Sequence, residues 1–262
     1  MSYTKIKVTE DGPVTVIAFA DPATMNAAGV DTAQELTAAF DAATAEGSST
    51  RAIVLTGEGR GFCSGANLSG GGGSASGGGD AGSSLKAVYN PLVTKVRNLS
   101  VPLVTAVNGA AAGVGCSIAL MGDMIVAAES AYFLQAFRRI GLIPDGGSTY
   151  LLPRMIGRAR AMEMALLGER VPAAKALEWG MINRVVPDAE LMPTAMALAN
   201  ELARGPASLA LIRQTIWDSL DTDWADQLTL EADRQSIAGR TEDFREGVSA
   251  FLQKRPAEFK GR

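Results

Sequence analysis

The strongest constraint on the fold is an uncharged stretch of the sequence from Val101 to Gly122. Its apolar start predicts a buried strand over Leu103–Val107, and the small residues that follow predict a tight turn over Asn108–Gly115 and a helix beginning at Cys116. Backbone N–H groups in such a turn and at the start of a helix lack intrahelical acceptors. The stretch therefore predicts a binding site for an anion, or for a carbonyl oxygen that becomes negative during a reaction.

This stretch has three other possible interpretations: a membrane-spanning helix, a dinucleotide-binding loop and a turn that serves packing alone. Pro102 and several glycines interrupt the apolar run well short of the roughly 18 residues of a membrane-spanning helix. Gly113-Val114-Gly115 begins a dinucleotide-binding fingerprint, but Ile118 stands where the third glycine should be, and no strand–helix–strand unit opens there. A tight turn that serves only the close packing of buried elements stays open on the local sequence alone.

The composition is that of a globular protein that handles small molecules. The chain has 262 residues, of which 47% are hydrophobic, so we expect one large domain with an appended helical segment. A net charge of -4 and a pI near 5.1 argue against binding to nucleic acid or to an acidic membrane. The first residues, Met1–Asp11, lack the apolar segment of a secretory signal, which predicts a cytoplasmic location.

Histidine is absent from the sequence, and Cys63 and Cys116 are the only cysteines. Two cysteines do not make a disulfide framework, although a single pair stays open. Without histidine, Ser-His-Asp and Cys-His nucleophilic machinery is excluded and a zinc site is disfavoured, so we expect no metal. Any acid–base chemistry then falls to Asp, Glu, Lys, Tyr or Cys.

The N-terminal part of the chain predicts a strand–helix–strand unit. Val14–Phe19 is apolar and β-branched, and we expect it to pair with Lys5–Val8. Thr32–Glu35 resembles a capping box that opens a helix, and Ala52–Thr56 predicts the next buried strand. Parallel strands joined in this way place ligand sites beyond their carboxyl ends, so the segment after Thr56 should matter.

That segment, Gly57–Leu68, is a second glycine-bearing loop at the end of a predicted strand, and the two loops could supply two convergent N–H donors. Residues Ser69–Ser84 are almost entirely Gly, Ser, Ala and Asp, a composition that buries too little to offset the entropy lost on ordering. We expect a mobile flap or a disordered loop there, with a plain surface insertion as an equal alternative. Helical spacing resumes over Leu85–Leu99.

Two further strands are predicted over Met124–Ala127 and Tyr132–Phe137, and a turn over Gly141–Ser148 leads into a helix. Within this turn Asp145 has two interpretations. Its carboxylate could cap the helix N-terminus, or it could act as a general base beside a carbonyl site. The local sequence favours the cap, because Asp is among the best N-cap residues.

The C-terminal part of the chain is predicted to be mainly helical. A helix over Arg158–Leu167 and another opened by Val171-Pro172 precede a strand over Ile182–Val186. From Asp188 onward the apolar spacing predicts about four helices and no strand. Three aromatic residues of these helices are expected to be core or interface anchors: Trp217, Trp224 and Phe251.

Three motifs together resemble the crotonase, or enoyl-CoA hydratase/isomerase, superfamily. They are Gly-Phe-Cys-Ser-Gly-Ala-Asn-Leu at 61–68, Val-Asn-Gly-Ala-Ala-Ala-Gly-Val-Gly-Cys at 107–116 and Gly-Leu-Ile-Pro-Asp-Gly-Gly-Ser at 141–148. The resemblance implies an α/β fold in which residues 1–187 form a crotonase-like spiral core of ββα units with an acyl-CoA site. Residues 188–262 would form a helical trimerisation and CoA-capping region. It also implies a CoA thioester as substrate, no separate cofactor, and assembly as a homotrimer or a dimer of trimers.

The same resemblance implies an oxyanion hole, a pair of N–H donors for the thioester oxygen. By this carry-over the donors are the backbone N–H groups of Ser64 and Val114. Family members usually have glycine where this chain has Val114. The substitution keeps the N–H and places a side chain near the acyl group.

The resemblance also bears on the catalytic base. Family hydratases use two glutamates, and the matching positions here are Ser117 and Phe137, neither of which can act as a base. Asp145 instead matches the catalytic carboxylate of isomerase members, including the ring-epoxide isomerase of phenylacetate breakdown. With the resemblance included, the base interpretation of Asp145 overtakes the cap, and an apolar pocket containing Phe137 is expected to raise its pKa.

The resemblance thus predicts an acyl-CoA isomerase that shifts a double bond from the 3-enoyl to the 2-enoyl position or rearranges an aryl-derived acyl-CoA. An enoyl-CoA hydratase (a lyase) using Asp145 and a catalytically weak acyl-CoA-binding scaffold are the alternatives. The residues expected to bind substrate are Arg60, Ala66, Leu68, Phe137 and Lys260. Lys260 is expected to reach a CoA phosphate across a subunit boundary, with a solvated tail as the alternative. Asn67 stands where the family usually has an aspartate.

Overall fold

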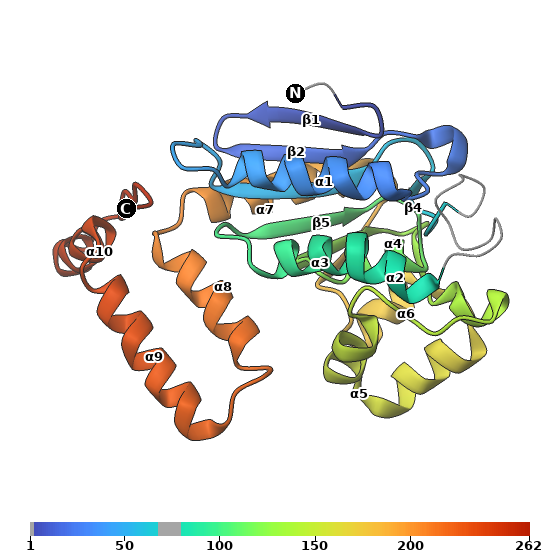
Figure 1. Cartoon of the computed structure of the whole chain (residues 1–262). Coiled ribbons are helices and arrows are strands. Elements are labelled where there is room, and N and C mark those ends of the chain that lie inside the picture. The colour runs from blue at the N-terminus through green and yellow to red at the C-terminus, as the bar shows by residue number, and fades with distance from the viewer. Residues whose placement is uncertain (1–2, 68–79) are drawn as a thin grey trace.

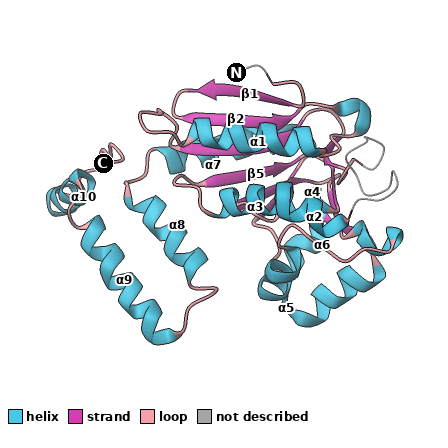
Figure 2. Cartoon of the chain, in the orientation of Figure 1, coloured by secondary structure: helices cyan, strands magenta, loops and turns pink. Residues whose placement is uncertain are grey.

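The computed structural model describes residues 3–67 and 80–262, and it is built on two β-sheets (Figures 1 and 2). The larger sheet has six strands in the order β1-β2-β3-β5-β7-β10. Its strands are β1 (Ile6–Asp11), β2 (Val14–Phe19), β3 (Ala52–Gly57), β5 (Leu103–Val107), β7 (Met124–Ala128) and β10 (Arg184–Val186). Apart from the antiparallel β1–β2 hairpin, every neighbouring pair in this sheet is parallel.

The smaller sheet has four short strands in the order β4-β6-β8-β9. They are β4 (Gly61–Cys63), β6 (Ala110–Ala112), β8 (Tyr132–Leu134) and β9 (Val171–Pro172). Three times in succession a strand of the larger sheet is followed directly by a strand of the smaller one, as β3–β4, β5–β6 and β7–β8, and helical residues follow each pair. The α/β core of ββα units predicted from the sequence is therefore confirmed.

Helices cover both faces of the larger sheet (Figure 1). One face carries α1 (Val30–Ala43) and α3 (Asn90–Arg97), and the other carries α7 (Leu191–Ala203). The apolar spacing predicted for the first of these helices holds, because Leu36, Phe40 and Ala43 are buried. All five residues of β5 are buried as well, as expected for a parallel strand covered on both faces.

The predicted capping box at Thr32–Glu35 is wrong. Helix α1 begins at Val30 behind Gly29, and neither residue supplies a side-chain cap. The Glu35 carboxylate instead accepts N–H bonds from the residues that lead into β1: Thr4 at 2.9 Å, Lys5 at 2.8 Å and Ile6 at 3.2 Å. Glu35 thus fixes the edge hairpin to the helix rather than capping the helix.

The turn predicted over Asn108–Gly115 contains a strand. Ala110–Ala112 form β6, which pairs with β4 on one side and β8 on the other, and α4 (Val114–Ala119) begins before the predicted Cys116. Similarly, Val171-Pro172 forms β9 rather than opening a helix, and α6 (Ala173–Glu178) follows it. Strands this short leave no periodicity to detect in a sequence.

The end of the glycine-rich segment is helical, contrary to the prediction of a mobile loop through Ser84. Asp80 caps α2 (Ala81–Ser84) by accepting the N–H of Gly82 at 3.1 Å, and the π-helical turn η3 (Leu85–Tyr89) continues into α3. The helix predicted from Leu85 is confirmed. The remainder of the predicted flap, Ser69–Gly79, lies outside the described residues.

Four helices follow Asp188, as predicted: α7, α8 (Ser208–Asp218), α9 (Trp224–Ala238) and α10 (Glu242–Gln253), besides a single 3-10 turn. The expected boundary at residue 187 precedes α7, yet α7 packs on β3, β5 and β7. The part that leaves the sheet therefore begins with α8, and α9 and α10 extend away from the core (Figure 1). Trp224 and Phe251 are 78% and 82% exposed, so neither is a core residue of the chain.

Helix α5 (Ser148–Leu167) follows β8 in the chain, lies on the side of the molecule away from α9 and α10 (Figure 1), and has a kink at Gly157, where φ is 77°. None of the described helices is both long enough and apolar enough to cross a membrane.

Candidate active site

The candidate site lies where β4, β6 and β8 end. These strands are parallel neighbours, so their carboxyl ends meet at one edge of the smaller sheet. The first two loops touch there: a Cβ placed on Gly65 would lie 3.0 Å from the carbonyl oxygen of Ala112 and 3.7 Å from Cα of Gly113. Gly65 also has a φ of +105°, which only glycine adopts readily, and the structure thus brings together the two loops that the sequence singled out.

The second loop ends in the first turn of α4. The N–H of Gly113 donates to the carbonyl of Leu134 at the end of β8 (2.8 Å). Val114 is the first residue of the helix, so its N–H has no intrahelical acceptor, and within residues 3–67 and 80–262 no other acceptor bonds to it. The Val114 side chain is 2% exposed. This N–H is therefore an open donor at the sheet edge.

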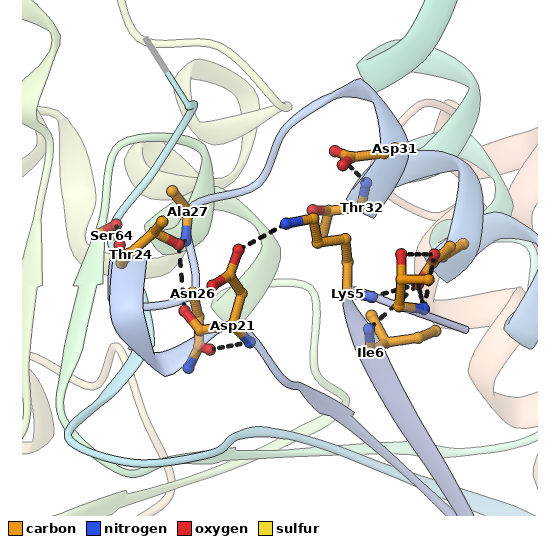
Figure 3. Close-up of polar contacts among 11 residues, drawn as sticks. Lys5, Ile6, Asp21, Thr24, Asn26, Ala27, Asp31, Thr32 and Ser64 are labelled. Atoms are coloured by element: carbon orange, nitrogen blue, oxygen red, sulfur yellow. Dashed lines mark hydrogen bonds and ion pairs between the residues drawn. The ribbon is translucent and has the colours of Figure 1, made fainter. Parts of the chain in front are cut away.

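Ser64 does not supply the matching donor that was expected. Its N–H already donates to the carbonyl of Met25 at 3.0 Å, and its hydroxyl donates to the carbonyl of Thr24 at 3.1 Å. Figure 3 shows Ser64 against the turn that contains Thr24. The prediction that the Ser64 N–H faces a substrate oxygen is wrong, because this N–H already serves to attach the first loop to that turn.

Ala66 offers a donor in its place. Ala66 forms a parallel bridge with Ala28, in which the N–H of Ala28 donates to Gly65 (2.7 Å) and the N–H of Asn67 donates back to Ala28 (3.4 Å). In such a bridge the N–H of the central residue points away from the partner strand. The Ala66 N–H has no acceptor in the described part of the chain, and the residue is exposed.

The turn that receives Ser64 is held by a buried asparagine that the sequence analysis did not identify. Asn26 is 1% exposed, and its Nδ2 donates to the carbonyls of Gly61 (2.7 Å) and Glu58 (2.9 Å). Its Oδ1 accepts the N–H of Asp21 at 2.9 Å, a bond drawn in Figure 3. Asn26 also has a φ of +59°, and Asn tolerates this conformation better than most residues do.

Asp145 carries the titratable group of the site. Its Oδ1 is buried and has no hydrogen-bond partner among the described residues, and burial raises the pKa of the carboxyl to about 6. The residue is not a helix cap, since α5 starts at Ser148 behind Gly147 and has no side-chain cap. The helix-cap interpretation of Asp145 is therefore wrong, and the general-base interpretation stays a prediction.

Phe137, which was expected to bind substrate and to form an apolar pocket with Asp145, lies against the second loop. It belongs to the 3-10 helix η4 (Ala136–Ile140), is 6% exposed, and its Cζ would lie 3.9 Å from a Cβ on Gly113. The segment that follows it exposes large apolar side chains: Ile140, Leu142 and Ile143. Large apolar side chains are therefore exposed on the segment that leads into the Asp145 turn.

Tyr89 is a second residue that sequence reasoning missed. Its side chain is buried, and its hydroxyl donates to the carbonyl of Ala28 at 2.7 Å, the same carbonyl that holds Asn67. Burial raises the pKa of Tyr89 to about 12, and the nearby carboxylate of Asp145 contributes to the rise. Tyr89 thus lies between the first loop and Asp145, at the end of a π-helical turn, a feature often found at functional sites.

Of the residues expected to contact CoA, the structure places only some near the candidate site. Ala66 is at the site, whereas Leu68 lies outside the described residues. Arg60 is exposed at the opposite, amino end of β4. Lys260 is far from the site in its own chain, because the adjacent Gly261 packs on Arg51, which precedes β3.

The described residues contain no group of three or more His, Cys, Asp or Glu side chains that could hold a metal ion. Both cysteines are buried, and burial raises the pKa of the Cys63 thiol to about 11 and that of the Cys116 thiol to about 12. Neither thiol is therefore a nucleophile at neutral pH.

The core of ββα units agrees with the family to which the sequence is matched. The family model described as enoyl-CoA hydratase/isomerase matches residues 9–262. The chain belongs to this family, whose members act on acyl thioesters.

Individual relatives refine the picture. The chain is 51% identical to 1,2-epoxyphenylacetyl-CoA isomerase of Escherichia coli (strain K12) over 215 residues, 81% of this chain and 82% of the relative. It is 45% identical to a "Probable enoyl-CoA hydratase" of Rhodobacter capsulatus over the full length of both. The crystal structure of enoyl-CoA hydratase from Mycobacterium smegmatis superposes with a TM-score of 0.91 at 28% identity, covering 98% of this chain and 99% of that one. The chain is thus an enzyme of the crotonase type.

Proposed function

We propose that the protein is an acyl-CoA isomerase in which Asp145 moves a proton between two carbon atoms of the substrate. The observation that carries this proposal is the buried Oδ1 of Asp145, which has no hydrogen-bond partner among the described residues. Its turn packs on α4, since a Cβ on Gly146 would lie 3.4 Å from Cγ2 of Val114, the residue with the open N–H. Ser117 and Phe137, at the positions where a second acid or base would be expected, cannot exchange protons. The segment between residues 68 and 79 contains no titratable residue either.

The N–H groups of Val114 and Ala66 would bind the thioester oxygen. Both are open donors on loops that touch at Gly65 and Gly113, so they can converge on one oxygen atom. As negative charge develops on that oxygen, each donor lowers the barrier, and loss of one such donor typically costs about 3 kcal/mol of transition-state stabilisation. This assignment replaces Ser64 by Ala66.

The proposed isomerisation needs no water molecule, because the proton that Asp145 removes is the one that it returns. The ionised Asp145 removes a proton from the carbon next to the thioester carbonyl of a 3-enoyl-CoA, and the electron pair moves to the carbonyl oxygen to give a dienolate. The protonated Asp145 then returns the proton to the γ carbon, and the double bond settles between the α and β carbons. A carboxyl with a pKa of about 6 suits both steps, because it is ionised at neutral pH and still basic enough to accept the proton.

The proposed class of acyl group is supported by the name of one relative and not by the geometry. The Escherichia coli relative is named for a ring-epoxide of phenylacetyl-CoA, which supports an aryl-derived acyl-CoA as a substrate of this chain. A rearrangement of that kind would use the same oxyanion pair. A panel of straight-chain and aryl acyl-CoA thioesters separates the two substrate types.

The runner-up is an enoyl-CoA hydratase, favoured by the full-length similarity to the Rhodobacter capsulatus protein. Adding water across a double bond normally requires a second acid or base next to the first, and burial alone, not a neighbouring carboxylate, raises the pKa of Asp145. A scaffold that only binds acyl-CoA is the third possibility, and it would turn over neither substrate.

Kinetics on 3-enoyl-CoA and 2-enoyl-CoA, with wild type and with Asp145→Ala, test the proposal. Wild type should isomerise the 3-enoyl substrate, and the variant should lose about 10³-fold in kcat, the usual contribution of a positioned base. The matched control is Asp41→Asn, which removes an exposed carboxylate of α1 that pairs with Lys95 of α3, and this variant should keep full activity. Isomerase activity that survives Asp145→Ala would refute the mechanism, and faster hydration of the 2-enoyl substrate would favour the hydratase.

The pH profile gives a second test. Because the ionised carboxylate is the active form, kcat/KM should rise with pH around a midpoint near 6 and level off above it. A profile that is flat between pH 5 and 8 would exclude Asp145 as the base.

We further infer assembly as a homotrimer or a dimer of trimers. The C-terminal helices expose large apolar side chains, Ile216, Trp224 and Phe251 among them, which a neighbouring copy could cover. Assembly would also allow Lys260 of one copy to approach CoA bound to another. Light scattering on the purified protein measures the mass directly, and a monomer at micromolar concentration would contradict the inference.

A further inference from the structure

We propose that Ser117 is a positioning residue, whose hydroxyl holds the Asp145 turn at a fixed place relative to the oxyanion helix α4. The proposal rests on the function proposed above, in which Asp145 is the base. It assigns Ser117 no contact with the substrate.

The Ser117 hydroxyl connects two parts of the site. Ser117 is fully buried on α4, and its Oγ lies 2.8 Å from the carbonyl oxygen of Asp145. The hydroxyl has one proton, and the alternative acceptor, the Gly113 carbonyl, is farther away at 3.4 Å. Across residues 3–67 and 80–262, no other hydrogen bond joins α4 to the turn over 141–147.

The Asp145 carbonyl is held from two sides. Ser148, at the start of α5, donates to it through its N–H at 3.1 Å and through its hydroxyl at 2.9 Å. Because Ser148 directly follows the turn in the chain, these two bonds stabilise the conformation of the turn but do not fix its position relative to α4. Only the bond from Ser117 relates the turn to the helix whose first N–H faces the substrate oxygen.

Close packing reinforces this link. A Cβ placed on Gly146 would lie 2.8 Å from Cβ of Ser117 and 3.4 Å from Cγ2 of Val114, so the turn lies directly on α4. Gly146 also has a φ of +59°. A side chain much longer than serine at position 117 would therefore displace the turn, and with it the carboxylate.

The position of the carboxylate matters because proton transfer depends steeply on geometry. A misplacement of about 1 Å can lower a rate by about 10²-fold. A looser turn would also let water reach Asp145 Oδ1, which is now buried, and would return its pKa toward the ordinary value of 3.8. The other titratable group facing this carboxyl is Tyr89, whose pKa of about 12 keeps it neutral throughout this range.

The test compares Ser117→Ala with Thr105→Val, which serves as the matched control. The Thr105 hydroxyl is also buried and donates to the carbonyl of Ala119, at the other end of α4, at 2.9 Å. Both variants lose one buried hydroxyl-to-carbonyl bond to or from the same helix, so they should lose similar thermal stability. Isomerase kinetics between pH 4.5 and 8 then separate a positioning role from a merely structural one.

Ser117→Ala should lower kcat about tenfold with little change in KM, and should shift the midpoint of the pH profile downward by about one unit. Thr105→Val should leave kcat and the midpoint at their wild-type values. If Ser117→Ala matches Thr105→Val in both quantities, Ser117 is only structural and the inference is overturned. Asp145→Ala measured in parallel separates the two proposals, because an active Asp145→Ala overturns the proposed function itself.

Discussion

At the scale of single residues, the unusual feature is a carboxylate oxygen, Asp145 Oδ1, that is buried and has no hydrogen-bond partner in the described part of the chain. Burial raises the pKa of Asp145 to about 6 from an ordinary value of 3.8. The folded protein therefore binds the Asp145 proton more tightly than the unfolded chain does, so the free energy of unfolding falls as pH rises from about 4 to about 6. Above that window the folded state carries the full penalty of a poorly solvated charge.

Asp145→Asn should remove this penalty. We expect the variant to be more stable than wild type by about 1 kcal/mol above pH 6.5, a figure reduced to allow for partial solvent access. Near pH 4 the gain should largely vanish, because the carboxyl of folded wild type, with a pKa of about 6, is then protonated and carries no buried charge. Urea unfolding at pH 4 and pH 7 measures the difference, and a gain of equal size at both values would show that ionisation is not its cause.

At this scale the sequence predicted Asp145, Val114 and Phe137 but chose Ser64 where the structure points to Ala66. A sequence motif shows which loop bears donors. Which N–H of the loop is free depends on its pairing with Ala28, a residue distant in the sequence whose bridge no local pattern encodes.

At the scale of elements, the small residues of α4 are explained by how closely that helix approaches β4. A Cβ placed on Gly115 would lie 2.7 Å from both Cβ and Sγ of Cys63. Only glycine allows the first turn of α4 to lie against the end of β4, so the uncharged stretch serves close packing, one of the interpretations that the sequence left open. Its binding role stays a proposal.

Gly115→Ala should therefore destabilise the protein by about 2 kcal/mol, the usual effect of overpacking a rigid core. It should also lower isomerase activity, because the Val114 N–H would move with the helix. Gly82→Ala is the matched control, since a Cβ on that glycine of α2 would meet only the Asp80 side chain, at 3.5 Å or more. Thermal unfolding measures both variants, and equal midpoints for the two would contradict the packing argument.

Most of the long elements could be predicted from periodicity, and the failures share one physical reason. β6 and β9 are too short to show a period. Glu35 stands at the spacing of a capping box, but its carboxylate accepts the N–H groups of Thr4 and Lys5. These features are determined by strand neighbours far along the chain.

At the scale of the whole molecule, one buried arginine fastens the C-terminal helices to the core. Arg213 on α8 is 5% exposed, and its guanidinium donates to the carbonyls of Val96 (2.7 Å), Arg97 (2.6 Å) and Leu99 (3.0 Å) at the end of α3. Its Nε donates to the Asp123 carboxylate at 2.7 Å. A single side chain thus satisfies the last carbonyls of one helix and pairs with the residue that ends the uncharged stretch.

Arg213→Ala should cost about 3 kcal/mol of unfolding free energy, because it removes the guanidinium from a partly buried carboxylate and from three carbonyls. Arg213→Lys should restore little of it, since one ammonium group cannot reproduce the fork of donors. The control Lys175→Ala removes an exposed pair with Glu178 and should change stability by less than about 0.5 kcal/mol. Urea unfolding monitored by circular dichroism provides the values, and full rescue by lysine would contradict the proposed geometry.

Helix α7 follows the expected boundary at residue 187 but packs on the larger sheet. Amphipathic spacing identified the four C-terminal helices but not which of them belongs to the sheet, because burial against β3 and β5 depends on tertiary neighbours. The core extends through α7, and the separate part begins at Ser208.

The covering of the larger sheet by α7 has a consequence for synthesis. Every residue assigned to the site lies between Asn26 and Ser148, whereas α7 begins at Leu191. During synthesis, all of these residues therefore leave the ribosome before α7, the helix that covers one face of the larger sheet. The growing chain is most open to aggregation while an apolar sheet face waits for α7, and chaperone contact is expected to matter most in that interval.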